Sequence, residues 1–493
     1  MTFNLETAAH PENLKRIVIE PVTRVEGHGK VTLLLDEDNR VHQARFHIVE
    51  FRGFEKFVQG RPFWEVPVLV QRLCGICPVS HNLAACKAMD MIIGATVPAA
   101  ADKLRRLMHM GQILQSHALH FFHLSAPDLL FGFDAAVGKR NIAGLAAAYP
   151  DIARQGVALR RYGQEVIRLT SGKRVHGTGV ISGGMNKNLS RDECDYLLKE
   201  IEQVIAWSQA AVELIKAIYR ERPDFHNSFG SYRSSFMSLV RADGALDLYH
   251  GGLRARDEHG QTIFDHVDYT HYWDYIHEEV KSWSYMKFPF IRAHGREQGW
   301  YRVGPLARIN NCDFIPTQRA DAERKIFKEF GGGSATQATL AYHWARMIEM
   351  LHAAEAIQEL LHDPDLQSDD LVSSGERQLR GVGVIEAPRG TLIHHYRINE
   401  DEQIVRANLI VATTHNNQAM NEAVRQVALQ YLDGQQITEG LLNHIEVAIR
   451  AFDPCLSCAT HALGKMPLEV ELLDAAGTLI QRLIKDSDGR HRT

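Results

Sequence analysis

The sequence predicts a mainly α fold of the α+β class, with a central bundle of long helices, small peripheral antiparallel strands and one large domain. Amphipathic spacing of apolar residues extends over long stretches in the middle of the chain. Short stretches rich in Val, Ile and Leu lie nearer both ends. With 493 residues a length prior alone would suggest about three domains, but two distant cysteine motifs favour a single one.

Strands are expected on both sides of the helical region. The first group lies within residues 16–56, and its three members are residues 17–19, 31–35 and 41–49. Glycines flank His28 in the first turn, which indicates a backbone that passes close to another part of the chain. The second group occupies residues 382–411.

Five long helices are expected from the helical spacing of apolar residues: 99–124, 149–170, 191–220, 335–362 and 415–432. Facing side chains of such a bundle can build a metal site. Residues 222–333 are expected to be loop-rich and aromatic, with a role in surface and partner contacts. The glycine-rich stretch 177–184 lacks the spacing of a dinucleotide-binding loop, so we expect this chain not to hold NAD itself.

Composition argues against several classes of function. The chain is 45% hydrophobic and 23% charged, and its net charge of -5 comes from interspersed residues, so no basic run predicts nucleic-acid binding. No stretch of about 18 apolar residues and no export signal is present, which predicts a soluble chain without a membrane span. We expect this chain to be cytoplasmic. Seven cysteines fit a reducing compartment. Three of them are expected to be buried apolar side chains: Cys86, Cys194 and Cys312.

Two Cys-x-x-Cys motifs carry the strongest functional signal. Cys74 and Cys77 stand near one end of the chain and Cys455 and Cys458 near the other, and a histidine follows each pair within four residues. At this spacing a tight turn entering a helix directs two sulfurs at one point. Four thiolates form a soft site that suits zinc, iron–sulfur, copper(I) or nickel.

A structural zinc site is the simplest alternative for two such motifs. The pairs of a zinc module usually lie within about 20 residues of each other. Here Cys455 follows Cys77 by 378 positions, 455 minus 77, a span that a small zinc module does not need. The sequence therefore favours a metal centre that joins both ends of one large domain.

These motifs resemble the paired signatures of the large, catalytic subunits of nickel-iron hydrogenases, in residues 72–81 and 453–461. The resemblance runs from about Ile17 to the last residues. It is nearest to the large subunit of the soluble, NAD-reducing hydrogenases, through residues 49–56 and 386–390 and the final cysteine block. It implies that residues 1–461 form a catalytic domain that splits H2 reversibly at a Ni-Fe centre.

The same resemblance assigns the metal ligands. It makes Cys74 and Cys455 terminal ligands of nickel, and Cys77 and Cys458 bridges to an iron that carries one carbon monoxide and two cyanides. The proton from H2 would pass to Cys455 and then to Glu26. Without the resemblance, Glu26 would be interpreted as a solvated turn carboxylate.

Further residues around the metals follow by resemblance. Arg389 would lie over the open metal position, and Asp453 would orient Arg389 or the thiolate. The Pro388 backbone and the Thr413 hydroxyl would contact the cyanides, while His81 would support the site without being a ligand. From the residues alone, an arginine in such a turn is usually at the surface and a helical histidine is usually a core or cap residue.

The resemblance also implies a magnesium ion near the chain's end. Its ligands would be the Glu55 carboxylate, the Leu409 carbonyl and His461, since a hard ion prefers oxygen ligands and keeps some water. The alternative for Glu55 is a surface salt bridge.

Partner chains are expected because this sequence has no further cysteines at iron–sulfur spacing. Electrons would leave through an iron–sulfur small subunit and reach NAD+ through diaphorase subunits that hold FMN and NAD. The resemblance further implies a nickel-dependent maturation protease and metallocentre-assembly chaperones. The protease would remove residues 462–493 as a C-terminal extension by cutting after His461; the alternative is a permanent C-terminal strand at residues 468–472.

Two other functions stay open on the sequence alone. The same metal site fits a regulatory subunit that senses H2 and signals to a kinase. A non-catalytic subunit in which zinc holds the two ends of the chain together is the other alternative.

Overall fold

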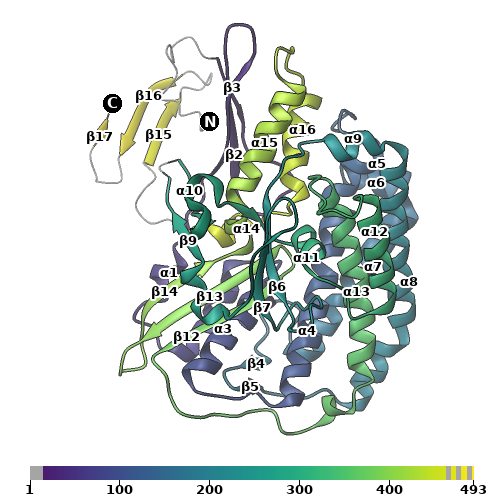
Figure 1. Cartoon of the computed structure of the whole chain (residues 1–493), viewed down its shortest axis with the longest axis vertical. Helices are drawn as coiled ribbons and strands as arrows, with labels where there is room; N and C mark the ends of the chain where they lie inside the picture. The colour runs from purple at the N-terminus through teal and green to yellow at the C-terminus, as the bar shows by residue number, and fades with distance from the viewer. Residues whose placement is uncertain (1–14, 282, 462–467, 474–478, 486–490, 493) are drawn as a thin grey trace.

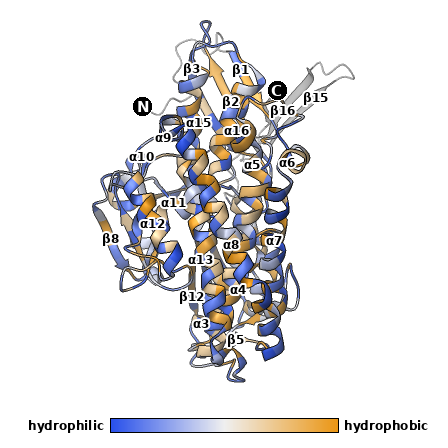
Figure 2. Ribbon diagram, turned by 90° about the vertical axis from the view of Figure 1, so that its right-hand side faces the viewer, coloured by the Kyte–Doolittle hydropathy of each residue, from blue (hydrophilic) through white to orange (hydrophobic). Residues whose placement is uncertain are grey.

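Four long helices form the centre of the fold in the computed structural model, which describes residues 15–281, 283–461, 468–473, 479–485 and 491–492. They are α4 (Ala99–Ala118), α7 (Pro150–Ser171), α8 (Arg191–Glu221) and α13 (Ala341–Leu361). Figure 1 shows these helices side by side. Apolar and polar residues alternate around α7 and α8 in Figure 2, as helices with one buried face require, whereas α13 is buried on nearly all sides. The predicted mainly α fold with small sheets is confirmed.

Local sequence explains where α8 begins and why α4 and α7 pack closely. Ser190 and Glu193 form a capping box at the start of α8. Where α4 crosses α7, a Cβ at Gly163 would lie 2.6 Å from the Gly111 carbonyl oxygen, so glycine lets the two backbones approach. Beyond its end, α4 continues through a π-helical turn at Leu119–Ser125 into α5 (Ala126–Phe131).

A three-stranded antiparallel sheet packs on the helix that directly follows the first cysteine pair. The strands are β12 (Arg380–Ala387), β13 (Gly390–Ile398) and β14 (Ile404–Ile410), and the helix is α3 (Pro78–Ile92). A Cβ at Gly383 would lie 2.0 Å from the Ala84 carbonyl oxygen, so this close packing requires glycine. The turn between β12 and β13 therefore lies near the N-terminal end of α3.

The N-terminal strands form a second antiparallel sheet: β1 (Lys15–Ile19), β2 (Gly29–Leu35) and β3 (Val41–Ile48). Helix α15 (Asn417–Tyr431) packs against β3 and against α16 (Glu439–Ala451), which leads to the second cysteine motif. The N-terminal sheet is thus joined to the C-terminal helices, as Figure 1 shows.

Residues 222–333 differ from the prediction of a loop-rich segment. Their largest elements are a four-stranded sheet of order β11-β6-β7-β8 and the helices α11 (Pro305–Asn311) and α12 (Gln318–Phe330). The strands are β6 (Ser235–Val240), β7 (Gly252–Arg256), β8 (Thr262–Val267) and β11 (Tyr301–Arg302). All residues of β6 are buried, so it lacks the alternation that marks a half-exposed strand.

The predicted helix 335–362 begins later, at Ala341. In the residues before Ala341, a side chain takes a backbone hydrogen bond that a helix would use: the Thr336 amide donates to Asn310 Oδ1 at 3.1 Å. The glycine-rich residues 177–184 lead into and form most of a short hairpin of β4 (Val180–Ile181) and β5 (Gly184–Met185).

Short elements complete the described chain. They are α1 (Phe54–Phe57), η3 (Phe63–Glu65), α2 (Val66–Leu69), η4 (Val70–Leu73), α6 (Ile142–Ala148), α9 (Pro223–Ser228), η6 (Tyr269–Asp274), β9 (Ile276–Glu279), β10 (Phe288–Ile291), η7 (Arg292–His294), α10 (Gly295–Gln298), η8 (Pro364–Gln367), α14 (Ala412–His415), η9 (Ser457–Ala459), β15 (Leu468–Leu473), β16 (Leu479–Lys485) and β17 (His491–Arg492). The strand expected at residues 468–472 is confirmed as β15, whereas the proposed cleavage point falls next to residues 462–467, outside the described residues. Within the described ranges, none of the helices combines the length and apolar character needed to span a bilayer.

Candidate metal centre

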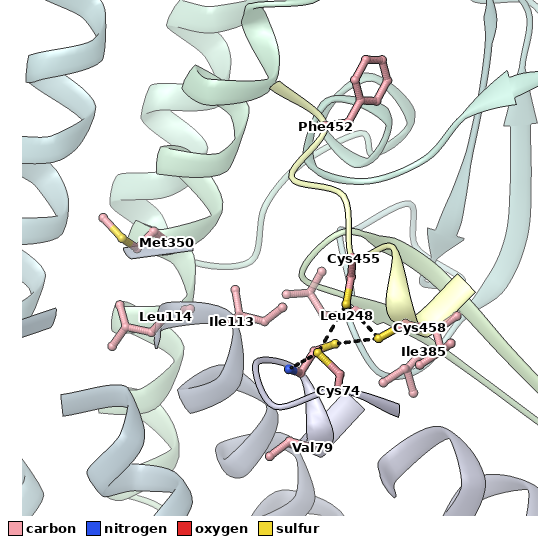
Figure 3. Packing of buried hydrophobic residues seen from close by; sticks show 14 of the residues in the cluster. Cys74, Val79, Ile113, Leu114, Leu248, Met350, Ile385, Phe452, Cys455 and Cys458 are labelled. Carbon is pink, nitrogen blue, oxygen red and sulfur yellow. Dashed lines mark hydrogen bonds between the residues drawn. The ribbon is translucent and has the colours of Figure 1, made fainter. Parts of the chain in front are cut away.

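Four cysteine sulfurs from the two ends of the chain meet in the core. Cys74 Sγ lies 3.3 Å from Cys455 Sγ, Cys77 Sγ lies 3.8 Å from Cys458 Sγ, and the Cys455 and Cys458 sulfurs are 2.8 Å apart. All four side chains are buried, and their sulfurs lie within 4.8 Å of one another. Figure 3 shows Cys455 and Cys458 entering from the C-terminal segment opposite Cys74.

The local backbone of the first motif favours a thiolate. Cys74 Sγ accepts hydrogen bonds from the amides of Ile76 and Cys77, each at 3.2 Å, just before α3 begins. Hydrogen bonds from the neighbouring thiols, led by Cys455, lower the pKa of Cys74 well below its usual value. Burial raises the pKa of Cys455 and Cys458. One thiolate is therefore held by the other thiols, and a soft cation would displace the remaining protons.

Glu26 contacts the second motif directly. Its carboxylate lies 3.0 Å from Cys455 Sγ and accepts hydrogen bonds from the backbone amide and the hydroxyl of Ser457. Burial raises the pKa of Glu26, and the Cys74 charge acts in the same direction. A Cβ at Gly27 would lie 2.8 Å from the Ser457 nitrogen, which confirms the expected close approach. By contrast, His28 is exposed.

A small cavity beside the sulfurs gathers the other predicted residues. Its lining includes Cys77, His81, Pro388, Arg389 and Thr413. Thr413 Oγ1 accepts the Cys455 amide at 2.9 Å, so this hydroxyl is tied to the backbone of the second motif.

Arg389 supplies positive charge at this cavity. It is 3% exposed, and its Nη2 donates to Asp453 Oδ1 at 3.1 Å. Its Nε and Nη1 atoms are buried and have no hydrogen-bond partner among the described residues. Two donors are thus left for a ligand, which fits a metal group bearing small anions. The soft sulfur set and these donors together fit a Ni-Fe centre of the predicted kind.

Arg308, which the sequence interpretation missed, holds the turn that carries Arg389. Its guanidinium donates to the carbonyls of Ala387 at 2.9 Å and Pro388 at 3.2 Å. Two buried carboxylates, Glu349 and Glu386, fix it with bonds of 2.6 to 2.8 Å. This buried ion network connects the segment expected to be loop-rich with the metal cavity.

Glu349 is the member of this network that the sequence alone could have indicated. Glu349 stands inside the apolar stretch Met347-Ile348-Glu349-Met350-Leu351, and a carboxylate there needs a buried partner. Arg308 had no such signal, because its partners come from α13 and β12, far away in sequence.

The predicted magnesium ligands have a mixed environment. Glu55 Oε1 accepts the Leu409 amide at 2.8 Å, and the Lys287 ammonium lies 2.9 and 3.2 Å from the two Glu55 oxygens. Glu55 is therefore a buried salt-bridge partner of Lys287, in place of the surface pair considered as the alternative. His461 Nε2 lies 2.9 Å from the Cys458 carbonyl oxygen, while its Nδ1 is buried without a partner in the described part of the chain.

The remaining cysteines lie as predicted. Cys86, Cys194 and Cys312 are buried and separate from the four-sulfur group. Among the residues that the structure describes, this group is the one set of at least three His, Cys, Asp or Glu side chains close enough to share an ion.

Comparisons with known proteins agree with this geometry. A family model described as nickel-dependent hydrogenase matches residues 52–142 and 238–461, and a HoxL-like model matches residues 16–51. The beta subunit of the NAD-reducing hydrogenase HoxS of Cupriavidus necator is 50% identical over 482 residues, which cover 94% of this chain and 99% of that protein. The F420-non-reducing hydrogenase of Methanothermobacter thermautotrophicus contains a chain that is 42% identical over 95% of this sequence and all of its own.

A solved structure is similar over nearly the same extent. The crystal structure of an NAD+-reducing [NiFe]-hydrogenase in its H2-reduced state superposes with a TM-score of 0.89 at 56% identity. The match covers 91% of this chain and 99% of that one. All three of these relatives belong to hydrogenases, which favours a hydrogenase metal centre over a zinc-clipped structural subunit.

Proposed function

The chain belongs to the nickel-dependent hydrogenase family as a large subunit, and from that premise we propose that it splits H2 reversibly into a hydride equivalent and a proton at the four-cysteine site. The observation that carries the proposal is the convergence of four buried sulfurs beside an acid and an arginine with two free donors. When bound, a Ni-Fe group would accept the hydride equivalent, which no amino-acid side chain can do.

The chain's own residues would handle the proton. Cys455 Sγ would take it, and Glu26, 3.0 Å away, would receive it next. A carboxyl with a raised pKa suits this role, because it holds the proton nearer neutral pH. Arg389 would stay charged over the cavity and exclude water, while Asp453 holds its orientation.

Partner subunits would complete the reaction. Similarity to an NAD-reducing hydrogenase subunit supports electron transfer through an iron–sulfur small subunit and FMN-containing diaphorase subunits to NAD+. The cytoplasm is the compartment in which NAD+ would be available to such a complex. Assembly chaperones and a nickel-dependent protease would mature the subunit.

Two finer points belong to the same proposal. Removal of residues 462–493 would leave residues 1–461 as the active domain, and intact-mass measurement of the active enzyme tests this directly. Magnesium at Glu55, the Leu409 carbonyl and His461 is supported by the free Nδ1 of His461. Because the Lys287 ammonium already neutralises Glu55, magnesium analysis of the complex decides between the two cations.

The function is tested on the complex purified after co-expression with its partners and maturation proteins. Nickel and iron in equal amounts, infrared bands of carbonyl and cyanide, and H2-dependent NADH formation are expected. Zinc alone would contradict the proposal. Metal bands without NADH formation would favour the H2-sensing alternative.

A further inference from the structure

Three buried side chains form a hydrogen-bonded series that ends at the metal cavity. The Tyr396 hydroxyl lies 2.7 Å from His394 Nδ1, and His394 Nε2 lies 3.2 Å from His81 Nδ1. Each of the three residues is at most 1% exposed. His394 and Tyr396 are alternate residues of β13 and so share one face of the sheet, whereas His81 comes from α3.

The Tyr396 hydroxyl determines which atom donates and which accepts in each of these hydrogen bonds. Within the described residues, His394 Nδ1 is the hydrogen-bond partner that the structure gives the Tyr396 hydroxyl. If His394 donated from Nδ1, the tyrosine hydrogen would be buried without an acceptor, at a cost of about 1–3 kcal/mol. Tyr396 therefore donates to His394 Nδ1.

The proton of each imidazole follows from that direction. His394 accepts at Nδ1, so that nitrogen carries no proton and the imidazole is neutral. A neutral His394 that accepts at Nδ1 carries its proton on Nε2 and donates to His81 Nδ1. His81 in turn carries its proton on Nε2.

We propose that Tyr396 and His394 are positioning residues that hold His81 as a hydrogen-bond donor, through Nε2–H, toward the anionic metal site. His81 lines the cavity next to Cys77 and Arg389, and Nε2 is the ring nitrogen not used by His394. A donor at this place stabilises thiolate or cyanide charge, whereas a lone pair would repel it. The inference rests on the proposed function, because it assigns the side chains that tune that site.

Tyr396→Phe tests the direction of these hydrogen bonds with little change in side-chain volume. Without the hydroxyl, the two tautomers of His394 come closer in energy, so His81 loses part of its Nε2–H donor population. In the matured complex we expect shifted cyanide and carbonyl infrared bands and a loss of H2 turnover of roughly 10-fold, the effect typical of residues that support metal ligands. Nickel content should be retained.

Tyr162→Phe is the matched control. Tyr162 is also buried, and its hydroxyl donates to the Leu197 carbonyl at 3.1 Å between α7 and α8, away from the cysteines. It should lower stability by a similar amount and leave the infrared bands unchanged.

Two substitutions of His394 distinguish the effect of the hydrogen-bond direction from the effect of side-chain packing. The amide of His394→Gln can accept from Tyr396 and donate to His81, so it should keep more turnover and bands nearer the wild type than His394→Leu. Equal loss in both variants, or unchanged bands in Tyr396→Phe, would overturn the proposal. If the wild-type complex lacks carbonyl and cyanide bands altogether, the proposed function fails and this inference fails with it. Normal wild-type bands that stay unchanged in Tyr396→Phe overturn this inference alone.

Discussion

Cys74 Sγ and Cys455 Sγ lie 3.3 Å apart although 381 residues separate them in the chain. The site therefore forms only where the fold brings the segment before α3 next to the segment after α16. Glu26 strengthens the same closure, since its carbonyl accepts the Leu456 amide at 3.0 Å. The positions of the Cys455 sulfur and the Glu26 carboxylate are thus coupled to the same backbone contact.

Cys455→Ser should abolish H2 cleavage and lower nickel retention in the purified complex. A serine hydroxyl stays protonated and is a poor ligand for a soft metal, so one corner of the four-sulfur site is lost. Nickel is measured by elemental analysis. Cys194→Ser is the control, because Cys194 is buried in α8 and does not belong to the sulfur group. Full nickel content and activity in Cys455→Ser would contradict the ligand assignment.

Glu26→Gln should keep both metals but slow the exchange of H2 with deuterated water. Glutamine preserves the volume and can still contact Ser457, yet it cannot accept the proton from Cys455. We expect a loss on the order of 100-fold, within the range for one acid–base group. Infrared bands like those of the wild type, measured alongside, show that the metal site is intact. An unchanged exchange rate would show that the proton leaves by another route.

The sequence predicted the sulfur group because the spacing within each Cys-x-x-Cys pair, Cys74 with Cys77 and Cys455 with Cys458, is local and chemically specific. Long helices were predictable for a similar reason, since apolar spacing reports a buried face within one segment. The Arg308 network was not predictable. Its members come from α11, α13 and β12, and only the folded backbone brings their charges together.

Arg308→Met should destabilise the chain by about 3–5 kcal/mol, the usual cost of removing one partner of a buried ion network. Glu349 and Glu386 would then be buried without their cation, and the Pro388 carbonyl would lose a donor. Denaturant unfolding measures the loss. Arg161→Met, which breaks an exposed ion pair with Glu200, should cost at most about 1 kcal/mol. Similar losses in both variants would exclude a special role for the buried network.

Gly304→Ala should displace the turn that carries Arg389 and so reduce H2 turnover. A Cβ at Gly304 would lie 2.7 Å from the Arg389 carbonyl oxygen, and the backbone there has a φ of 96°. Gly132→Ala is the control for backbone strain without a steric contact. Gly132 has a φ of 89°, and no atom lies within 4 Å of the place where the new methyl group would be. Both variants carry the backbone cost of about 1–3 kcal/mol, but only Gly304→Ala should shift the cyanide bands. Matching infrared spectra in the two variants would mean that the position of Arg389 does not depend on this contact.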